Sequence, residues 1–416
     1  MLAERRADRL AHARSVLAGD PAIRFELAQD NDALLAACPP GTLVVNATGL
    51  GKDAPGSPLR APIFPAAAIA WDLNDRGDLL LLDQARGAGI TAVDGWRYFP
   101  HGWLADAGRM CWSSELASAL GVELRVLPPI RPADAVIGKV TPAAAALTGL
   151  PAGLPIACGA GDFPTALLGS GVAGPGAGSD VTGTSTLIAV HGAQPLAAPG
   201  IMNLHAAGPG WIGFTMIDAG GDAVRWARRA LAVDSIGFAE LEALAATAPT
   251  GAEGLLFSPF LNSDRLLGAE VRAGFHGLSA RHGRPHLLRA VLEGTALASA
   301  ANLERMRAAG AVIERIVASG GGAKGPLWPA IKASVWGVPV LVPENPESAL
   351  LGAAILAGAG TGLSPDRAEA IRRCVRYARE ILPDPAAQAL YRERAALFDA
   401  LFRATLPLQA RLAAAG

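Results

Sequence analysis

Short apolar runs alternate with amphipathic stretches along most of the chain. This alternation is typical of an α/β protein with largely parallel sheets. Strands are predicted at 43–46, 68–73, 137–140, 156–158, 211–218 and 316–318, and a hairpin arm at 181–190. Helices are predicted at 2–18, 79–87 and 286–309, with others beginning at Trp112, after Gly221 and around Pro326. A proline-rich connector at 127–132 separates the less regular first part from the better-defined second part.

The segment 316–325 runs from a short apolar strand into a glycine turn, and a helix with proline in its first turn follows. Glycine lets a backbone come close to a ligand, and the free N–H groups at a helix start attract phosphate oxygens. The pattern therefore indicates a nucleotide contact at Gly320, Gly321, Gly322, Ala323 and Lys324.

Asp162 follows the predicted strand 156–158 in a glycine turn and precedes Pro164. Open α/β sheets place their chemistry at such strand ends. A carboxylate there could accept a proton from a substrate hydroxyl, which contributes roughly 10²–10⁴-fold in rate. It could equally cap the helix that follows by accepting hydrogen bonds from its first N–H groups. Both interpretations of Asp162 remain open on the residues alone.

A second candidate for phosphate binding is the string Thr182, Gly183, Thr184, Ser185 and Thr186, which offers hydroxyls and backbone N–H groups on a tight turn. The commoner explanation is a hairpin turn whose threonines reflect strand propensity. The pair Gly220 and Gly221, at another junction from strand to helix, has the same two interpretations.

Composition narrows the class of protein. The 416 residues are 51% hydrophobic and 18% charged, with a formal net charge of -1. This charge gives no electrostatic case for nucleic acid or an anionic membrane. No apolar run reaches the ~18 residues of a membrane span, and the first residues lack a signal-peptide core. Four cysteines, far apart in the sequence, favour a reduced cytoplasmic protein.

Several of these motifs, taken in order, resemble the FGGY family of carbohydrate kinases, in particular its xylulokinase-like members. The segments 273–278 and 286–293 look like the family's C-terminal signature. Asp162 with the preceding glycines resembles the catalytic aspartate motif, and 180–185 resembles the second phosphate loop. The segments 319–324 and 350–354 resemble the adenosine-binding region, so the likeness covers roughly residues 108–416.

The resemblance implies an actin-like, ribonuclease-H-like α/β fold with ATP and Mg²⁺ bound between two domains. It further implies that Asp162 is the general base and a metal contact, and that the acceptor is a small sugar or polyol such as a pentulose. The implied nucleotide contacts are Thr182, Gly183, Thr184, Ser185, Gly220, Gly221, Gly320, Gly321, Gly322, Ala323 and Lys324.

The first part of the chain departs from the family. No Asp-x-Gly-Thr loop, with which such kinases begin, precedes residue 108. The segments 46–53, 71–74 and 94–96 instead resemble the C-terminal part of a shikimate dehydrogenase-like protein. We therefore expect a partial Rossmann-like unit at 1–104, a remnant of the kinase N-terminal domain with its connector at 105–160, and the kinase C-terminal domain at 161–416.

Three hypotheses on function follow. The first is an ATP-dependent sugar kinase, whose activity the lack of the first phosphate loop would impair. The second is a non-catalytic nucleotide-binding remnant, or a fusion product, that needs a partner to supply the missing domain. The third, motivated only by residues 1–104, is a fragment of a shikimate- or quinate-type dehydrogenase.

Overall fold

The computed structural model describes residues 2–4, 25–27, 30–46, 56–72, 79–93, 104–106, 108–119, 121–231, 235–264, 267–268 and 270–415. The chain divides into two compact units, Met1–Pro129 and Ile130–Gly416, and the boundary falls within the proline-rich connector.

The first unit contains a three-stranded parallel sheet in the order β3-β4-β5. Its strands are Leu43–Asn46, Ile69–Asp72 and Thr91–Val93, and its helices are α2 (Asn31–Ala36) and α3 (Leu80–Gly87). Buried Leu35, Leu59 and Leu81 form its small core. The strand predicted at 43–46 and the helix predicted at 79–87 are confirmed, and the strand predicted at 68–73 is confirmed for residues 69–72, since residue 73 lies outside the described residues. The unit also contains β6 (Ala105–Asp106), β7 (Cys111–Trp112), α5 (Ser114–Ala119) and η2 (Leu124–Val126).

Two predictions in the first unit are wrong. Residues Leu2–Glu4 form strand β1 and pair in parallel with β2 (Phe25–Leu27), so backbone pairing outweighs the helical periodicity predicted from residue 2. Residues 5–18 of that predicted helix lie outside the described residues. Trp112 lies in β7, and α5 begins two residues later because the Ser113 hydroxyl accepts the N–H of Leu116 (3.2 Å).

The resemblance of residues 1–104 to a dehydrogenase stays a prediction. The parallel sheet with its helices is consistent with a partial Rossmann-like unit. However, the motif residues 47–53 and 94–96 lie outside the described part of the chain.

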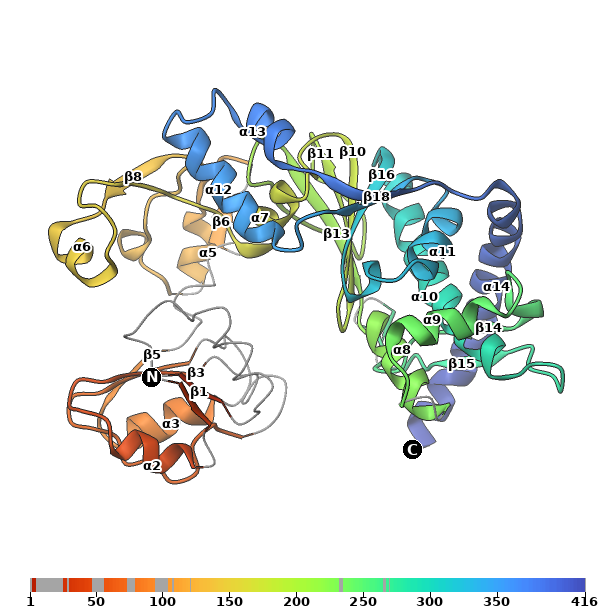
Figure 1. The fold of residues 1–416 in the computed structure, drawn as a ribbon, viewed down its shortest axis with the longest axis horizontal. Coiled ribbons are helices and arrows are strands. Elements are labelled where there is room, and N and C mark those ends of the chain that lie inside the picture. The colour runs from red at the N-terminus through yellow and green to blue at the C-terminus, as the bar shows by residue number, and fades with distance from the viewer. Residues whose placement is uncertain are drawn as a thin grey trace. The chain divides into compact units, whose positions relative to one another are not determined.

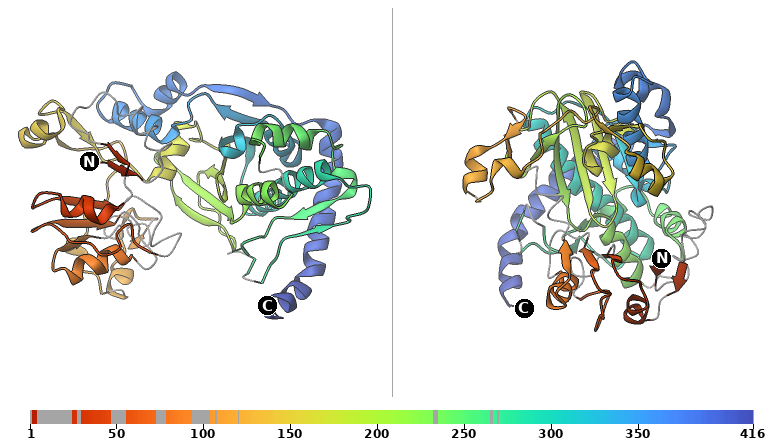
Figure 2. Two further views of the ribbon diagram at one scale, coloured as in Figure 1. Left: turned by 60° about the horizontal axis from the view of Figure 1, so that its bottom comes forward. Right: turned by 90° about the vertical axis from the view of Figure 1, so that its left-hand side faces the viewer.

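The second unit is built on a seven-stranded mixed sheet in the order β12-β13-β11-β10-β16-β17-β18 (Figures 1 and 2). Strands β10, β11 and β13 pair in antiparallel fashion, and β16 and β17 extend the sheet beside β10 in parallel. This is the arrangement of a ribonuclease-H-like domain. The strands are β10 Gly176–Thr182, β11 Thr186–Gly192, β12 Met202–His205, β13 Trp211–Ile217, β16 Ile313–Gly320, β17 Val340–Pro343 and β18 Tyr377–Ile381.

Helices cover both faces of this sheet (Figure 2). Because side chains alternate along a strand, Ile188 and Val190 of β11 pack with Leu303 of α10 (Arg284–Ala308) on one face. Ala189, between them, packs with Leu167 of α7 (Asp162–Gly169) on the other face. The remaining elements are β8 Val136–Lys139, α6 Pro142–Thr148, β9 Pro155–Ala157, α8 Gly220–Ala230, α9 Phe238–Ala246, η3 Ala252–Gly254, β14 Leu256–Ser258, β15 Gly274–His276, η4 Gly321–Ala323, α11 Leu327–Trp336, α12 Ser348–Gly360, α13 Arg367–Cys374 and α14 Pro385–Ala415.

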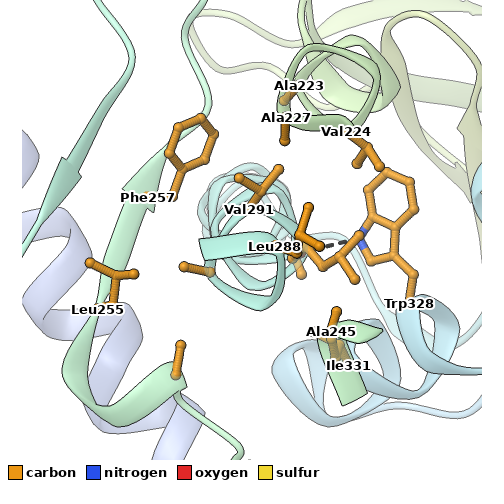
Figure 3. Close-up of a cluster of buried hydrophobic side chains, with 14 of the residues drawn as sticks. Ala223, Val224, Ala227, Ala245, Leu255, Phe257, Leu288, Val291, Trp328 and Ile331 are labelled. Atoms are coloured by element: carbon orange, nitrogen blue, oxygen red, sulfur yellow. Dashed lines mark hydrogen bonds between the residues drawn. The ribbon is translucent and has the colours of Figure 1, made fainter. Parts of the chain in front are cut away.

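Helix α10 is the centre of the largest buried cluster (Figure 3). Its Leu288 and Val291 point toward side chains from α8, α9, α11 and β14, among them Val224, Ile331 and Phe257. The indole N–H of Trp328 donates to the carbonyl of Leu292 (3.1 Å), which fixes α11 against α10. The helix predicted at 286–309 is therefore confirmed as a core element that supports α8 and α11.

None of the helices in the described residues is both long and apolar enough to cross a membrane. The four cysteines carry free thiols.

Candidate nucleotide-binding site

The turn between β10 and β11 is the centre of the candidate site. Thr182 ends β10 and Thr186 begins β11, and the N–H of Gly183 donates to the carbonyl of Ser185 (2.9 Å) to close the turn. Gly183 and Thr184 are exposed, whereas Thr182 and Thr186 are buried. The two buried hydroxyls lie 3.1 Å apart and face the protein interior. The exposed tip of the turn, rather than these two hydroxyls, is the part that a phosphate can reach.

The N-terminus of α8 packs directly on this turn. The N–H of Asp222 donates to the carbonyl of Thr184 (3.0 Å). A Cβ on Gly220 would lie 2.0 Å from Thr186 Oγ1, and one on Gly221 would lie 1.9 Å from the Gly183 carbonyl oxygen. Only glycine at both positions allows this approach, which brings the positive end of an 11-residue helix to the turn.

The glycine segment after β16 approaches the same turn from another direction. Gly320 has a φ of +77°, and its Cβ would lie 2.5 Å from the Thr182 carbonyl oxygen. A Cβ on Gly322 would lie 2.7 Å from Thr182 Cβ. Gly320, Gly321 and Lys324 are exposed, and Gly322 and Ala323 are buried. The structure therefore brings together the three glycine-containing segments that the sequence singles out.

Two side chains that the sequence analysis did not single out hold the glycine segment in shape. Arg379 of β18 donates to the carbonyls of Ala323, Lys324 (3.4 Å) and Gly325 (3.0 Å). The Glu242 carboxylate of α9 accepts the N–H groups of Leu327 (2.8 Å) and Trp328 (3.4 Å) at the start of α11. Each contact crosses a long stretch of sequence, so no local pattern could have indicated it.

Titration of Glu242 is expected to make the free energy of unfolding depend on pH. Burial raises its pKa above the ordinary 4.5, against smaller lowering effects of the N–H groups of Leu327 and Trp328 and the cations Arg379 and Lys332. The folded state then keeps a proton that the unfolded state has lost. The free energy of unfolding therefore falls as pH rises from 4.5 through the raised pKa.

We expect the non-titrating variant Glu242→Gln to lose less stability over this window than the wild type. Urea unfolding between about pH 4 and pH 8 measures the difference. Parallel stability curves for the two proteins would contradict the prediction.

Asp162 is the first residue of α7 and is exposed. Its Oδ1 accepts the N–H of Phe163 (2.7 Å), so the carboxylate contacts the first turn of its own helix. Helix α7 is held by close packing on α12, where a Cβ on Gly352 would lie 1.9 Å from the Thr165 carbonyl oxygen. The hydrogen bond between Asp162 and Phe163 stays within α7 and does not join Asp162 to the β10–β11 turn. Its catalytic and metal-binding roles remain proposals.

A buried charged pair lies beneath the turn. Lys332 Nζ lies 2.5 Å from Asp180 Oδ2 and donates to Thr182 Oγ1 (2.9 Å). The only available sequence signal for Lys332 is that it is the one charged residue in 327–336. Asp180 belongs to the phosphate-loop motif, but its ion pair could not be predicted without the fold.

The β10–β11 turn, the start of α8 and the Gly320 segment each contain glycine, and no side chain covers the turn at Gly183, where nothing lies within 4 Å of a Cβ position. These residues therefore leave room for a nucleotide. Among the described residues, no group of three or more His, Cys, Asp or Glu side chains is placed to hold a metal ion. Mg²⁺ commonly binds through one or two carboxylates together with substrate phosphates. A magnesium ion that arrives with the nucleotide would be held mainly by phosphate oxygens and water.

The second unit has a ribonuclease-H-like sheet with a glycine-containing turn at the end of β10. This arrangement is typical of the actin-like class of ATP-binding domains. Within this class, the C-terminal domain of the FGGY family of carbohydrate kinases matches residues 179–361, and the family's N-terminal domain matches residues 103–169. The chain belongs to the FGGY family of carbohydrate kinases.

Individual relatives support the assignment. The chain is 34% identical over 299 residues to an autoinducer-2 kinase of Enterobacter sp. (strain 638), covering 67% of this chain and 56% of the relative. It is 30% identical over 376 residues to the autoinducer-2 kinase of Escherichia coli (strain K12), covering 82% of this chain and 69% of the relative. The chain thus spans little more than half the length of the first of these relatives.

Solved structures confirm the predicted fold class. The xylulose kinase from Rhodospirillum rubrum superposes with a TM-score of 0.69 at 32% identity, over 74% of this chain and 63% of that chain. A kinase from Brucella ovis, described as a xyloylose kinase, gives a TM-score of 0.67 at 28% identity, over 73% of this chain and 63% of that chain.

Proposed function

We propose that this chain transfers the γ-phosphate of ATP to a hydroxyl of a small sugar or polyol, such as a pentulose. The observation that carries the proposal is the convergence of the α8 N-terminus and the Gly320 segment on the β10–β11 turn, whose tip is exposed. Membership of a carbohydrate kinase family, with relatives named as xylulose kinase and autoinducer-2 kinase, supports a sugar-like acceptor.

In the proposed reaction, the Asp162 carboxylate takes the proton of the acceptor hydroxyl. The hydroxyl oxygen forms a bond to the γ-phosphorus, and the bond from this phosphorus to the β–γ bridging oxygen breaks to release ADP. The N–H groups of the turn and of the α8 N-terminus offset charge on the phosphates, because phosphoryl transfer depends mainly on positioning and electrostatics. Mg²⁺ bound with the nucleotide would neutralise part of the same charge.

A coupled ADP-release assay with Mg·ATP tests the proposal, using xylulose, ribulose, glycerol and erythritol as acceptors. We expect ADP release above the acceptor-free rate with at least one of them. No acceptor-dependent release, together with no binding of ADP by calorimetry, would overturn the proposal.

A nucleotide-binding module without turnover is the second candidate function. It is favoured by the short match to the family's N-terminal domain, at residues 103–169. Binding of ADP without acceptor-dependent release would support this candidate. Release restored by adding a separately produced N-terminal domain of a related kinase would identify the partner that it needs.

A further inference from the structure

Lys332 lies in a fully buried network directly beneath the phosphate turn. Lys332 is 1% exposed, Asp180 is 0% exposed and Thr182 is 1% exposed. The Thr182 hydroxyl donates to Asp180 Oδ1 (2.6 Å) and accepts from Lys332 Nζ (2.9 Å). Since its one proton is used on Asp180, the 3.1 Å contact with Thr186 Oγ1 is a bond that Thr186 donates. The hydroxyl at the start of the turn is thereby saturated.

A buried ion pair is not needed to fill this space. Removing two charges from water costs several kcal/mol per ion, and an apolar pair of similar volume is often as stable. The Lys332 ammonium also lies 4.5 Å from the centre of the Trp328 ring and 5.6 Å from that of Trp336. The feature that an apolar residue would not reproduce is the directed hydrogen bond to Thr182.

The position of Lys332 in the fold joins two parts of the site. It lies on α11, the helix that follows the Gly320 segment, and its partners lie on β10, the strand that leads into the turn. Figure 1 shows that α11 and β10 are separate elements of the second unit. A shift of α11 would therefore be transmitted through Nζ to Thr182.

We propose that Lys332 is a positioning residue that, through Asp180 and Thr182, locks the β10–β11 turn to α11 and to the Gly320 segment that precedes this helix. The expected effect on KM for ATP rests on the proposed function. The expected effect on the conformation of the β10–β11 turn does not depend on turnover. Lys332 itself is too deeply buried to touch the nucleotide.

The test uses the full chain carrying Asp180→Val together with Lys332→Met. The double variant leaves no buried charge without a partner, whereas Lys332→Met alone would strand Asp180 and endanger folding. The matched control is Arg289→Met with Glu293→Gln, which removes another buried ion pair (2.7 Å) on α10. We expect the Kd for ADP and the KM for ATP of the Asp180/Lys332 variant to rise about tenfold, a size common for residues of one hydrogen-bond network. The KM of the Asp180/Lys332 variant for the sugar is expected to stay unchanged. In the control, the Kd for ADP and the KM for ATP are expected to stay unchanged.

Hydrogen exchange of the nucleotide-free proteins separates this proposal from the proposed function. Faster exchange in 180–186 in the Asp180/Lys332 variant but not in the control would support the positioning role, even if the wild type binds no ADP. If the folded variant matches the wild type in ADP affinity and in exchange of 180–186, the proposal is wrong. A tenfold loss of affinity in both double variants would also overturn it, because the effect would then be general destabilisation.

Discussion

Asp162→Asn is expected to lower acceptor-dependent ADP release by roughly 10²–10⁴-fold, the usual contribution of a general base. The amide keeps the size of the carboxylate and can still accept the N–H of Phe163, so α7 is expected to keep its first turn. The affinity for ADP, measured by calorimetry, is expected to remain within about twofold, because the carboxylate acts on the acceptor hydroxyl. The combination of lost turnover and retained binding is the diagnostic result.

Asp366→Asn is the matched control for this experiment. Asp366 is also an exposed aspartate at a helix start, where its side chain accepts the N–H of Glu369 (2.8 Å). Asparagine caps helices about as well as aspartate, and we expect wild-type turnover from this variant. If Asp162→Asn retained wild-type turnover as well, Asp162 would be only a helix-start residue, which is the alternative that the sequence left open.

Local patterns predicted the parts of the fold whose determinants are local. The hairpin arm expected at 181–190 is confirmed as β11, although the first residues of that range form the end of β10 and the turn, and the helix expected at 286–309 is confirmed as α10. The glycines at 220, 221, 320 and 322 could be found because close approach of neighbouring atoms leaves no room for a Cβ at these positions. The sequence could show that each segment was unusual. Their convergence on one turn was implied only by the family resemblance.

The supporting side chains could not be predicted, because their partners are distant in the sequence. Arg379, Glu242 and Lys332 each act on a backbone or side chain that folding alone brings near. At residues 2–4 the local pattern predicted a helix, and this prediction was wrong because these residues form a strand that pairs with β2. Local propensity is a weak guide where a strand partner supplies the hydrogen bonds.

Packing around the turn implies that the site tolerates no added volume at the start of α8. The Gly221 Cα faces the Gly183 carbonyl oxygen so closely that an added Cβ would lie 1.9 Å from it, and a backbone oxygen cannot rotate away as a side chain can. Alanine at this position must therefore displace either the turn or the first residues of α8. Both carry N–H groups that the proposed function directs at phosphate.

Gly221→Ala is accordingly expected to lower kcat/KM for ATP about a hundredfold, since a displacement of about 1 Å in a positioning element has effects of this size. Gly358→Ala on α12 is the control, because nothing lies within 4 Å of its Cβ position, and alanine there is expected to leave kcat/KM unchanged. Steady-state kinetics over ATP concentration, with circular dichroism to verify folding, measures both variants. A folded Gly221→Ala protein with wild-type kcat/KM would show that the contact between α8 and the turn does not shape the nucleotide site. Lost activity together with unfolding would place the effect of Gly221 on stability instead.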